Sequence, residues 1–433
     1  MIKKFVLPVF IILGLLLSSC SPSSGQNLPT TLATQVAPTQ TAPAPVTPLP
    51  PTATLTSVPP TATATPPPEN PIQHFASGQE FTVTSIHMVD TTTGWAIGSL
   101  VGVGDHVLYT ADGASTWKDV TPPEKQALNA DRKFAIGFFQ DAKTAWVTFA
   151  IFTGNPVPTE ALVWRTSDGG LTWQASQPVD LTGISEIYVP SDLQLVAGQA
   201  GWLLVHVGAG MNHDYVVIYR TADGGASWSR VIDPYTDGGI QSCTKTGMLF
   251  TDATHGWLTG DCNGVKAGAL LYKTIDAGST WQVVNLPEPP SYPGLFSDES
   301  MVACGSYDPF FFSNDTGHVS VNCHDFSGTQ ITYSYYLFTT QDGGNTWTST
   351  SYPGLGIYFF SIEVGWTSSM KIQQTTDGGK TWKPISDVSW TPEMDFVSEQ
   401  VGWAVATTGE EVALVKTDNG GAKWTMLIPT IRP

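Results

Sequence analysis

Short apolar runs alternate with turn-forming residues over most of the chain, and they recur in sets of four. In one set, apolar residues at 248–250 precede turn residues at 251–256, and the chain returns through Trp257 and Leu258. A third run covers 269–272 and leads into another turn, after which a fourth run begins at Trp281. Runs this short, bounded by Gly, Asp and Thr, predict four antiparallel strands joined by tight turns. Seven such sets occupy roughly residues 80–428, so an all-β repeat protein is expected.

Each set contains one copy of the pattern Thr-x-Asp-Gly-Gly-x-Thr-Trp between its third and fourth runs. The clearest copies begin at Thr166 and Thr375. The Asp carboxylate can accept hydrogen bonds from backbone N–H groups of a turn, and glycine adopts positive φ without a steric penalty. We therefore assign this box a structural role. Its Asp (or Asn) and Trp positions are Asp112 and Trp117, Asp168 and Trp173, Asp223 and Trp228, Asp276 and Trp281, Asp342 and Trp347, Asp377 and Trp382, and Asn419 and Trp424.

Some copies depart from the box pattern. Ala114 and Ala277 each stand where the other copies have glycine, and we expect these two turns to relax into a different geometry. Ser227 replaces Thr but keeps the hydroxyl, and the last copy has Asn419 and Lys423 in place of Asp and Thr.

A second marker, Gly-Trp or Ala-Trp, precedes nearly every box. Its tryptophans are Trp95, Trp146, Trp202, Trp257, Trp366 and Trp403, and Gly317-His318 takes the place in the fifth set. Together with the box positions these account for 13 of the 15 tryptophans, so we interpret tryptophan here as structural rather than as a ligand-stacking residue.

The repeats predict the blades of a β-propeller. The box Asp or Asn positions are 56, 55, 53, 66, 35 and 42 residues apart, which fits one four-stranded antiparallel blade per repeat. The box resembles the Asp-box, or BNR repeat, of sialidases, sortilin-type receptors and several glycoside hydrolases. Combined with Gly-Trp, it is most similar to the photosystem II assembly and stability factors and their relatives in non-photosynthetic bacteria. The resemblance implies a seven-bladed β-propeller over residues 78–430. We expect no strand exchange at closure, unless residues 72–76 add an outer strand to the last blade.

The N-terminus has the features of an export signal. Lys3 and Lys4 precede an apolar stretch at 5–17, so residues 1–19 are expected to be a signal peptide. The sequence Leu17-Ser18-Ser19-Cys20 resembles the lipobox of bacterial lipoproteins, which implies a diacylglycerol on Cys20 and a membrane-tethered, extracytoplasmic propeller. An ordinary secretory signal is the alternative. Residues 20–72 are rich in Pro, Thr and Ala and are expected to form a disordered linker.

The other four cysteines occupy matching places in consecutive repeats. Cys243 and Cys262 lie 13 residues before and 6 after Gly256, and Cys304 and Cys323 lie at the same offsets from Gly317. This predicts the disulfides Cys243–Cys262 and Cys304–Cys323, which export permits. A zinc site is the weaker alternative because no Cys-x-x-Cys spacing occurs.

The formal net charge of −18 argues against nucleic acid or anionic lipid as a partner of the folded part. No cofactor and no metal are expected, because His206, His213 and His324 fall in separate loops without metal-ligand spacing.

The second-to-third-strand loops and the blade connections share one face, where ligands bind in sialidases. On this face we expect a binding surface that includes Phe152, Tyr235, Tyr292, Phe296 and Phe326, although these side chains could instead only pin long loops to the sheets.

The favoured function is a non-catalytic scaffold for protein interaction or assembly, with a protein partner. The alternative is a glycan-active or glycan-binding propeller, either a sialidase-like or glycanase-like hydrolase or a lectin. The five arginines are not expected to converge on a substrate carboxylate as they do in a sialidase. The sequence does not exclude a glycanase, because its many Asp and Glu residues could include a catalytic carboxylate pair.

Overall fold

The computed structural model describes residues 71–125, 134–152, 160–184, 187–196, 198–210, 213–234, 240, 243–262, 268–297, 301–388, 390–409 and 411–432. The expected signal peptide, the lipidation site Cys20 and nearly all of the expected linker lie outside these ranges. Within them, no helix has the length and apolar character needed to cross a membrane.

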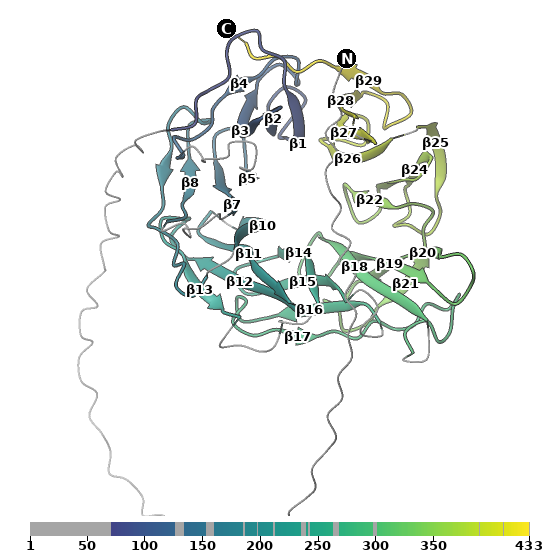
Figure 1. The fold of residues 1–433 in the computed structure, drawn as a ribbon. Helices are drawn as coiled ribbons and strands as arrows, with labels where there is room; N and C mark the ends of the chain where they lie inside the picture. Colours follow the sequence, from purple (N-terminus) through teal and green to yellow (C-terminus); the bar gives the residue numbers. More distant parts are fainter. Residues whose placement is uncertain are drawn as a thin grey trace, which may run out of the picture. The chain divides into compact units, whose positions relative to one another are not determined.

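The strands form seven antiparallel blades, one for each sequence repeat (Figure 1). Blade 1 contains β1 (Thr82–Met88), β2 (Gly94–Leu100), β3 (Val103–Thr110) and β4 (Lys118–Asp119); blade 2 contains β5 (Ala135–Phe139), β6 (Ala145–Phe149), β8 (Val163–Thr166) and β9 (Gln174–Ala175). Blade 3 contains β10 (Ile187–Val196), β11 (Ala200–Gly210), β12 (His213–Thr221) and β13 (Ser229–Ile232), and the short β7 (Ile151–Phe152) pairs with β10.

The remaining four blades repeat this order. Blade 4 contains β14 (Thr244–Phe250), β15 (Gly256–Asp261), β16 (Leu270–Thr274) and β17 (Gln282–Val283); blade 5 contains β18 (Val302–Phe311), β19 (Gly317–Asp325), β20 (Thr332–Thr340) and β21 (Thr348–Ser351). Blade 6 contains β22 (Gly356–Phe359), β23 (Gly365–Ser368), β24 (Lys371–Thr375) and β25 (Lys383–Asp387); blade 7 contains β26 (Thr391–Phe396), β27 (Gly402–Thr408), β28 (Glu411–Thr417) and β29 (Thr425–Leu427). Asp261 pairs with Gly305, which joins blades 4 and 5 into one hydrogen-bonded sheet.

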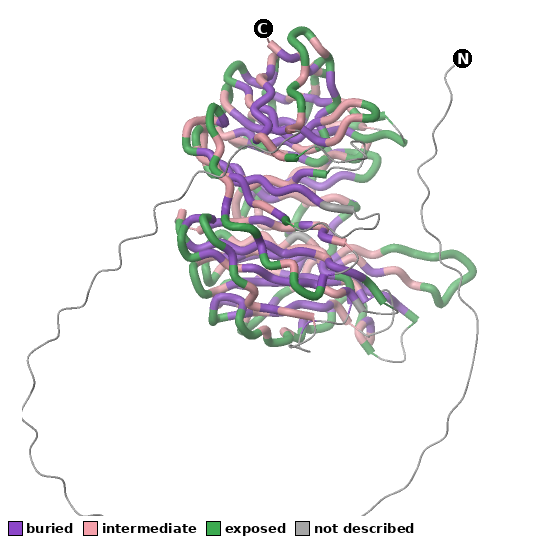
Figure 2. Tube along the Cα trace, turned by 60° about the vertical axis from the view of Figure 1, so that its left-hand side comes forward, coloured by how far each residue is buried: buried purple, intermediate pink, exposed green. Residues whose placement is uncertain are grey.

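Apolar side chains fill the spaces between neighbouring blades. Each of seven buried clusters draws its members from two adjacent blades, and the cluster around Trp403 and Ile86 joins blade 7 to blade 1. Figure 2 shows that buried residues run along the strands while exposed residues gather at the turns. The stability of the ring therefore rests on blade-to-blade burial of apolar surface.

The box turns share one hydrogen-bonded geometry. In the second box, Asp168 Oδ1 accepts from the N–H of Thr172 at 2.9 Å, Asp168 Oδ2 accepts from the Thr172 hydroxyl at 2.6 Å, and the Gly170 N–H donates to Thr166 Oγ1 at 3.0 Å. Such hydrogen bonds, the Thr381 hydroxyl first among them, lower the pKa of the equivalent Asp377 to about 2. The Asp carboxylate of the box is thus engaged in hydrogen bonds within its own turn.

The two alanine-containing turns do not relax into another geometry, contrary to expectation. Ala114 and Ala277 adopt φ values of 71° and 63°, as the glycines do in other boxes. Their turns keep the hydrogen bonds from the Thr116 and Thr280 N–H groups to the box Asp. The carboxylate and hydroxyl network therefore outweighs the cost of a Cβ at positive φ.

Five of the six tryptophans of the Gly-Trp marker hydrogen-bond to the next blade. Their indole N–H groups donate to backbone carbonyls of the following blade at 2.8–3.3 Å: Trp95 to Asp141, Trp146 to Gly224, Trp202 to Ala277, Trp366 to Gly420 and Trp403 to Gly113. In blade 5, the His318 imidazole contacts the carbonyl oxygen of Ile362 in the same way, at 2.9 Å. This explains why a ring nitrogen donor recurs at this position.

The ring closes through the C-terminal segment, which the sequence did not lead us to expect. Ile431 forms an isolated parallel β-bridge with Trp117 of blade 1, and the Trp117 N–H donates to the Thr430 carbonyl at 2.9 Å. The Ile431 N–H donates to the carbonyl of Gln79 at 2.9 Å. Residues 72–76 do not extend the last blade; the Ile72 N–H donates to the Glu124 carbonyl, so this segment lies along blade 1.

Candidate functional site

Both expected disulfides are present, and they lie at the same end of neighbouring blades. Cys243–Cys262 ties the start of blade 4 to the end of β15, and Cys304–Cys323 links directly opposed residues of β18 and β19. All four cysteines are buried. They fix the strand ends from which the second-to-third-strand loops of blades 4 and 5 emerge.

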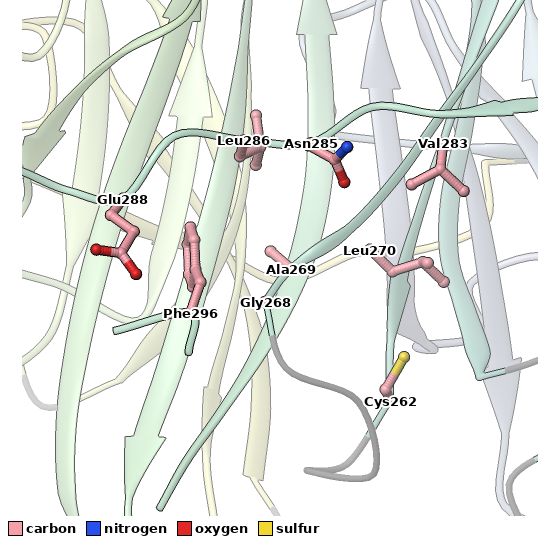
Figure 3. Close-up of a pocket in the computed structure, with 9 residues that line it drawn as sticks. All are labelled: Cys262, Gly268, Ala269, Leu270, Val283, Asn285, Leu286, Glu288 and Phe296. Atoms are coloured by element: carbon pink, nitrogen blue, oxygen red, sulfur yellow. The ribbon is translucent and has the colours of Figure 1, made fainter. Parts of the chain in front are cut away.

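A cavity of about 320 Å³ opens beside the first disulfide (Figure 3). Its lining residues are Cys262, Gly268, Ala269, Leu270, Val283, Asn285, Leu286, Glu288 and Phe296. Figure 3 shows the Phe296 ring next to Glu288 on one side of the cavity, with Asn285 and Leu286 along its upper edge. The cavity thus combines an aromatic wall with an amide and a carboxylate.

The segment that leaves β17 builds one wall of this cavity. Leu295 is buried between blades 4 and 5 and anchors the segment. The Gly294 N–H donates to Glu288 Oε2 at 2.5 Å, and Gly294 adopts a φ of 85°, which favours glycine. This local turn holds Glu288 at the edge of the cavity.

Three exposed aromatic side chains gather around Asp325 and His324 of blade 5. Tyr292, Phe326 and Tyr333 are 41%, 45% and 56% exposed. The Tyr292 hydroxyl donates to Asp325 Oδ2 at 3.3 Å, and the Asp325 charge raises the pKa of Tyr292. The ring of His324 lies 4.9 Å from that of Tyr333.

A second, smaller hollow of about 90 Å³ lies between blades 4 and 5; it is lined by Asp261, Ala303, Gly305, Asn322, His324 and Phe326. We call the two hollows together with Tyr292, Phe326 and Tyr333 the blade 4–5 face.

The structure brings together three of the five aromatic residues proposed from the sequence. Tyr292, Phe296 and Phe326 all belong to the blade 4–5 face. Phe152 lies in β7, whose partner is Ile187 of blade 3, and its side chain is outside the described part. Tyr235 also lies outside the described residues. Tyr333 was missed, although it is directly opposite His324 in the β19–β20 hairpin and strand pairing could have found it.

Several carboxylates with raised pKa values lie on strands near the ring interior and serve as joints between blades. Asp192 Oδ1 accepts from the Met248 N–H at 3.0 Å, and burial raises the pKa of Asp192. Asp395 accepts from the Met88 N–H, and burial raises its pKa as well. Each carboxylate thus caps a backbone group of the following blade. The sequence offers only a faint signal for them, namely an acid in a strand that is otherwise apolar.

Hairpin-turn acids form their turns, with one exception. Asp90, Asp141 and Asp252 accept N–H groups of their own turns through their carboxylates. At 313–316 the Ser313 hydroxyl accepts these N–H groups in place of a carboxylate. In the described part, no group of three His, Cys, Asp or Glu side chains is arranged to hold a metal ion.

Comparison with known proteins gives a limited set of similarities. No protein-family model matches the chain. A xyloglucanase of Hypocrea jecorina (strain QM6a) is 22% identical over 283 residues, covering 57% of this chain and 31% of that protein. The chain thus spans less than a third of the length of that relative.

Among solved structures, a GH74 enzyme of Niastella koreensis is 12% identical, with 81% of this chain and 62% of that chain covered and a TM-score of 0.35. An α-L-arabinanase of Penicillium chrysogenum, complexed with arabinobiose, is 14% identical, with 69% and 96% covered and a TM-score of 0.44.

The chain is a β-propeller of the Asp-box type. This assignment follows from its seven box turns and its seven blades. The similarities described above do not support the resemblance to photosystem II assembly factors.

Proposed function

We propose that this propeller binds a polysaccharide on the blade 4–5 face. The observation that carries the proposal is the group of exposed aromatic residues Tyr292, Phe326 and Tyr333 around Asp325 and His324, next to the hollow of about 90 Å³ that Phe326 helps to line. Sugar rings have apolar C–H faces that pack on aromatic rings, and their hydroxyls pair with amides and carboxylates such as Asn285 and Glu288.

The surroundings of the face favour binding without large rearrangement. Cys323 and Leu295 are buried beneath it, and two disulfides cross-link the strands that carry its loops. A preformed surface avoids most of the ordering entropy that a mobile loop would lose on binding. The similarity to a xyloglucanase supports a glycan as the ligand, but it covers 31% of that enzyme, so its catalytic activity is not carried over.

Two buried disulfides indicate that the folded chain resides in an oxidising, extracytoplasmic compartment. The lipid anchor at Cys20 and the role as a protein scaffold stay predictions. If the anchor is present, a glycan-binding propeller would hold a polysaccharide close to the membrane, so the predicted anchor and the proposed glycan binding are compatible.

Affinity electrophoresis of the full chain through gels that contain xyloglucan, arabinan or other soluble polysaccharides tests the proposal. We expect at least one polysaccharide to retard the protein and Phe326→Ala to abolish the retardation. Phe360→Ala is the matched control, because Phe360 is a similarly exposed phenylalanine, 38% against 45%, on a hairpin turn of blade 6. Equal retardation of the two variants would place binding elsewhere, and no retardation by any polysaccharide would overturn the proposal.

A further inference from the structure

Three polar side chains at the loop end of blade 3 form a hydrogen-bonded series that the glycan proposal does not use. Ser191 Oγ lies 3.2 Å from His206 Nε2, and His206 Nδ1 lies 2.9 Å from Asp214 Oδ1. We propose that Ser191, His206 and Asp214 are the nucleophile, the general base and the orienting acid of a site that hydrolyses carboxylic esters. A nucleophile within reach of a base, itself held by a third group, is the arrangement such chemistry needs.

The burial of the three residues fits these roles. Ser191 is exposed, the His206 side chain is 19% exposed and that of Asp214 is 8% exposed. The Lys245 N–H of blade 4 donates to Asp214 Oδ2 at 2.8 Å, which leaves Oδ1 to face the imidazole. A substrate can therefore reach the hydroxyl, while the carboxylate that orients the histidine is fixed from behind.

Backbone geometry places Ser191 where it can reach the histidine. The pairing of β10 with β11 shifts register between Pro190 and Asp192, so Ser191 is the extra residue of a β-bulge. A bulge redirects a side chain away from the regular alternation of the strand. Here the redirected hydroxyl faces the ring of His206 on the neighbouring strand.

The propeller repeat does not require this arrangement. Register shifts occur at the same place in blades 1 and 4, where the extra residues are Thr84 and Thr246. Thr84 donates to the carbonyl of Ile97, and Thr246 donates to the hydroxyl of Thr259. Neither bulge residue bonds to a histidine. Blade 3 has the same bulge as these two blades, but only blade 3 of the three adds the Ser–His–Asp series.

The buried pair of His106 and Asp119 in blade 1 shows what a structural His–Asp contact looks like in the same chain. Its Nδ1 to Oδ2 distance is 2.7 Å, but neither residue is exposed and Phe75 stacks on the imidazole at 3.8 Å. No serine bonds to His106 in the described part. The contrast favours a chemical role for the blade 3 series.

The proposed reaction needs only water besides the ester. Ser191 Oγ attacks the acyl carbon, and its proton passes to His206 Nε2. The ester C–O bond then breaks, and the alcohol leaves with that proton. Water attacks the acyl-serine, gives a proton to His206, and the carboxylic acid departs as Ser191 regains its hydroxyl. In the resting structure the Ser191 hydroxyl donates to Asp192 Oδ2 at 2.8 Å, so it must rotate toward His206 before attack.

The position of the series indicates which ester it takes. Asp214 lies beside the turn between β11 and β12, and His206 lies further back along β11; this turn is a second-to-third-strand connection like those that form the blade 4–5 face. These connections share one face of the ring, so we assign an acyl group carried on a sugar hydroxyl as the substrate. This assignment rests on the proposed function, whereas cleavage of a small ester does not.

The experiment uses the full chain, a fluorophosphonate probe and p-nitrophenyl acetate. We expect the probe to label Ser191, as mapped by peptide mass spectrometry, and Ser191→Ala and His206→Ala each to slow ester hydrolysis by roughly 100-fold or more. Ser369→Ala, at an exposed bend of blade 6, is the control and should hydrolyse at the wild-type rate. Thermal unfolding of each variant verifies that it is folded.

Labelling at another residue, or hydrolysis that Ser191→Ala leaves unchanged, would overturn the proposal. The sugar-borne substrate is tested separately by release of acetate from an acetylated polysaccharide. Cleavage of p-nitrophenyl acetate without acetate release from the polysaccharide would refute the assigned substrate and leave the esterase site standing. Failure of the protein to bind polysaccharide, with Ser191 still labelled, would count against the proposed function alone.

Discussion

The indole N–H of Trp403, in the last blade, donates a hydrogen bond to the backbone carbonyl of Gly113, in the first box turn, at 3.3 Å. These residues are 290 positions apart in sequence. The same contact joins Trp366 to Gly420 within the ring at 2.8 Å. Closure of the propeller is therefore one more copy of its ordinary blade-to-blade contact.

Replacing Trp403 with Phe removes this donor and leaves the buried Gly113 carbonyl without it. We expect a loss of about 1–3 kcal/mol in the free energy of unfolding, measured by urea denaturation. Trp366→Phe is the matched variant and should cost a similar amount. If Trp403→Phe leaves the free energy of unfolding unchanged while Trp366→Phe lowers it, the hydrogen bond from Trp403 to Gly113 does not contribute to closure.

The C-terminal segment supplies a second closure contact through Ile431. Its side chain is 5% exposed within the cluster that joins blades 7 and 1, whereas that of Ile428 is 60% exposed. Ile431→Ala should lower the free energy of unfolding by about 2–4 kcal/mol, and Ile428→Ala should change it by less than about 0.5 kcal/mol. Equal effects in thermal or urea unfolding would contradict the closure that we describe.

The alanine at positive φ in the first box offers a stabilising substitution. Ala114 has a φ of 71°, a conformation that glycine adopts without strain. Ala114→Gly should raise the free energy of unfolding by about 0.5–1 kcal/mol, because relief of strain exceeds the added entropy of the unfolded chain. The exposed Ala422, in the turn of the last box but without positive φ, is the control, and Ala422→Gly should not stabilise. A destabilised Ala114→Gly protein would show that the methyl group matters more through packing.

Burial raises the pKa of Asp105 to about 6, which links its protonation to stability. Because the folded-state pKa lies above the unfolded value of 3.8, folding favours the protonated form. Its stabilising contribution is complete below about pH 4 and is lost as the pH rises through 6. Asp105→Asn cannot ionise, so at pH 7 it should be more stable than wild type by on the order of 1–3 kcal/mol, and this gain should vanish near pH 4. Chemical denaturation at both pH values tests this, and a pH-independent difference would rule out titration of Asp105 as its source.

Much of the fold follows from features that are local in sequence. Each box contains its own turn residues, and each disulfide joins cysteines 19 residues apart, so the turns, the blades and both bridges were predictable. The ring closure was not, because Ile431 and Trp117 meet only after seven blades have been assembled. The prediction that the Ala114 turn would relax was wrong, because the residue at one position does not show how strongly the surrounding hydrogen bonds hold the turn.

The site was predictable to a smaller extent. Loop aromatics pointed to Tyr292, Phe296 and Phe326, but Tyr333 joins them only through the pairing of β19 with β20. The relation of Ser191 to His206 depends on a bulge in β10, which leaves no clear mark in the sequence. Contacts that depend on register across strands were therefore the part that sequence reasoning could not supply.

Glycan binding at the blade 4–5 face is the central claim, and titration calorimetry at Tyr333 tests it most directly. Tyr333 is 56% exposed, so its substitution should leave the fold intact. With a polysaccharide that retards the wild-type chain, Tyr333→Phe should keep the affinity within about threefold because it keeps the ring, and Tyr333→Ala should weaken it by roughly tenfold or more. Wild-type affinity in Tyr333→Ala would contradict the claim.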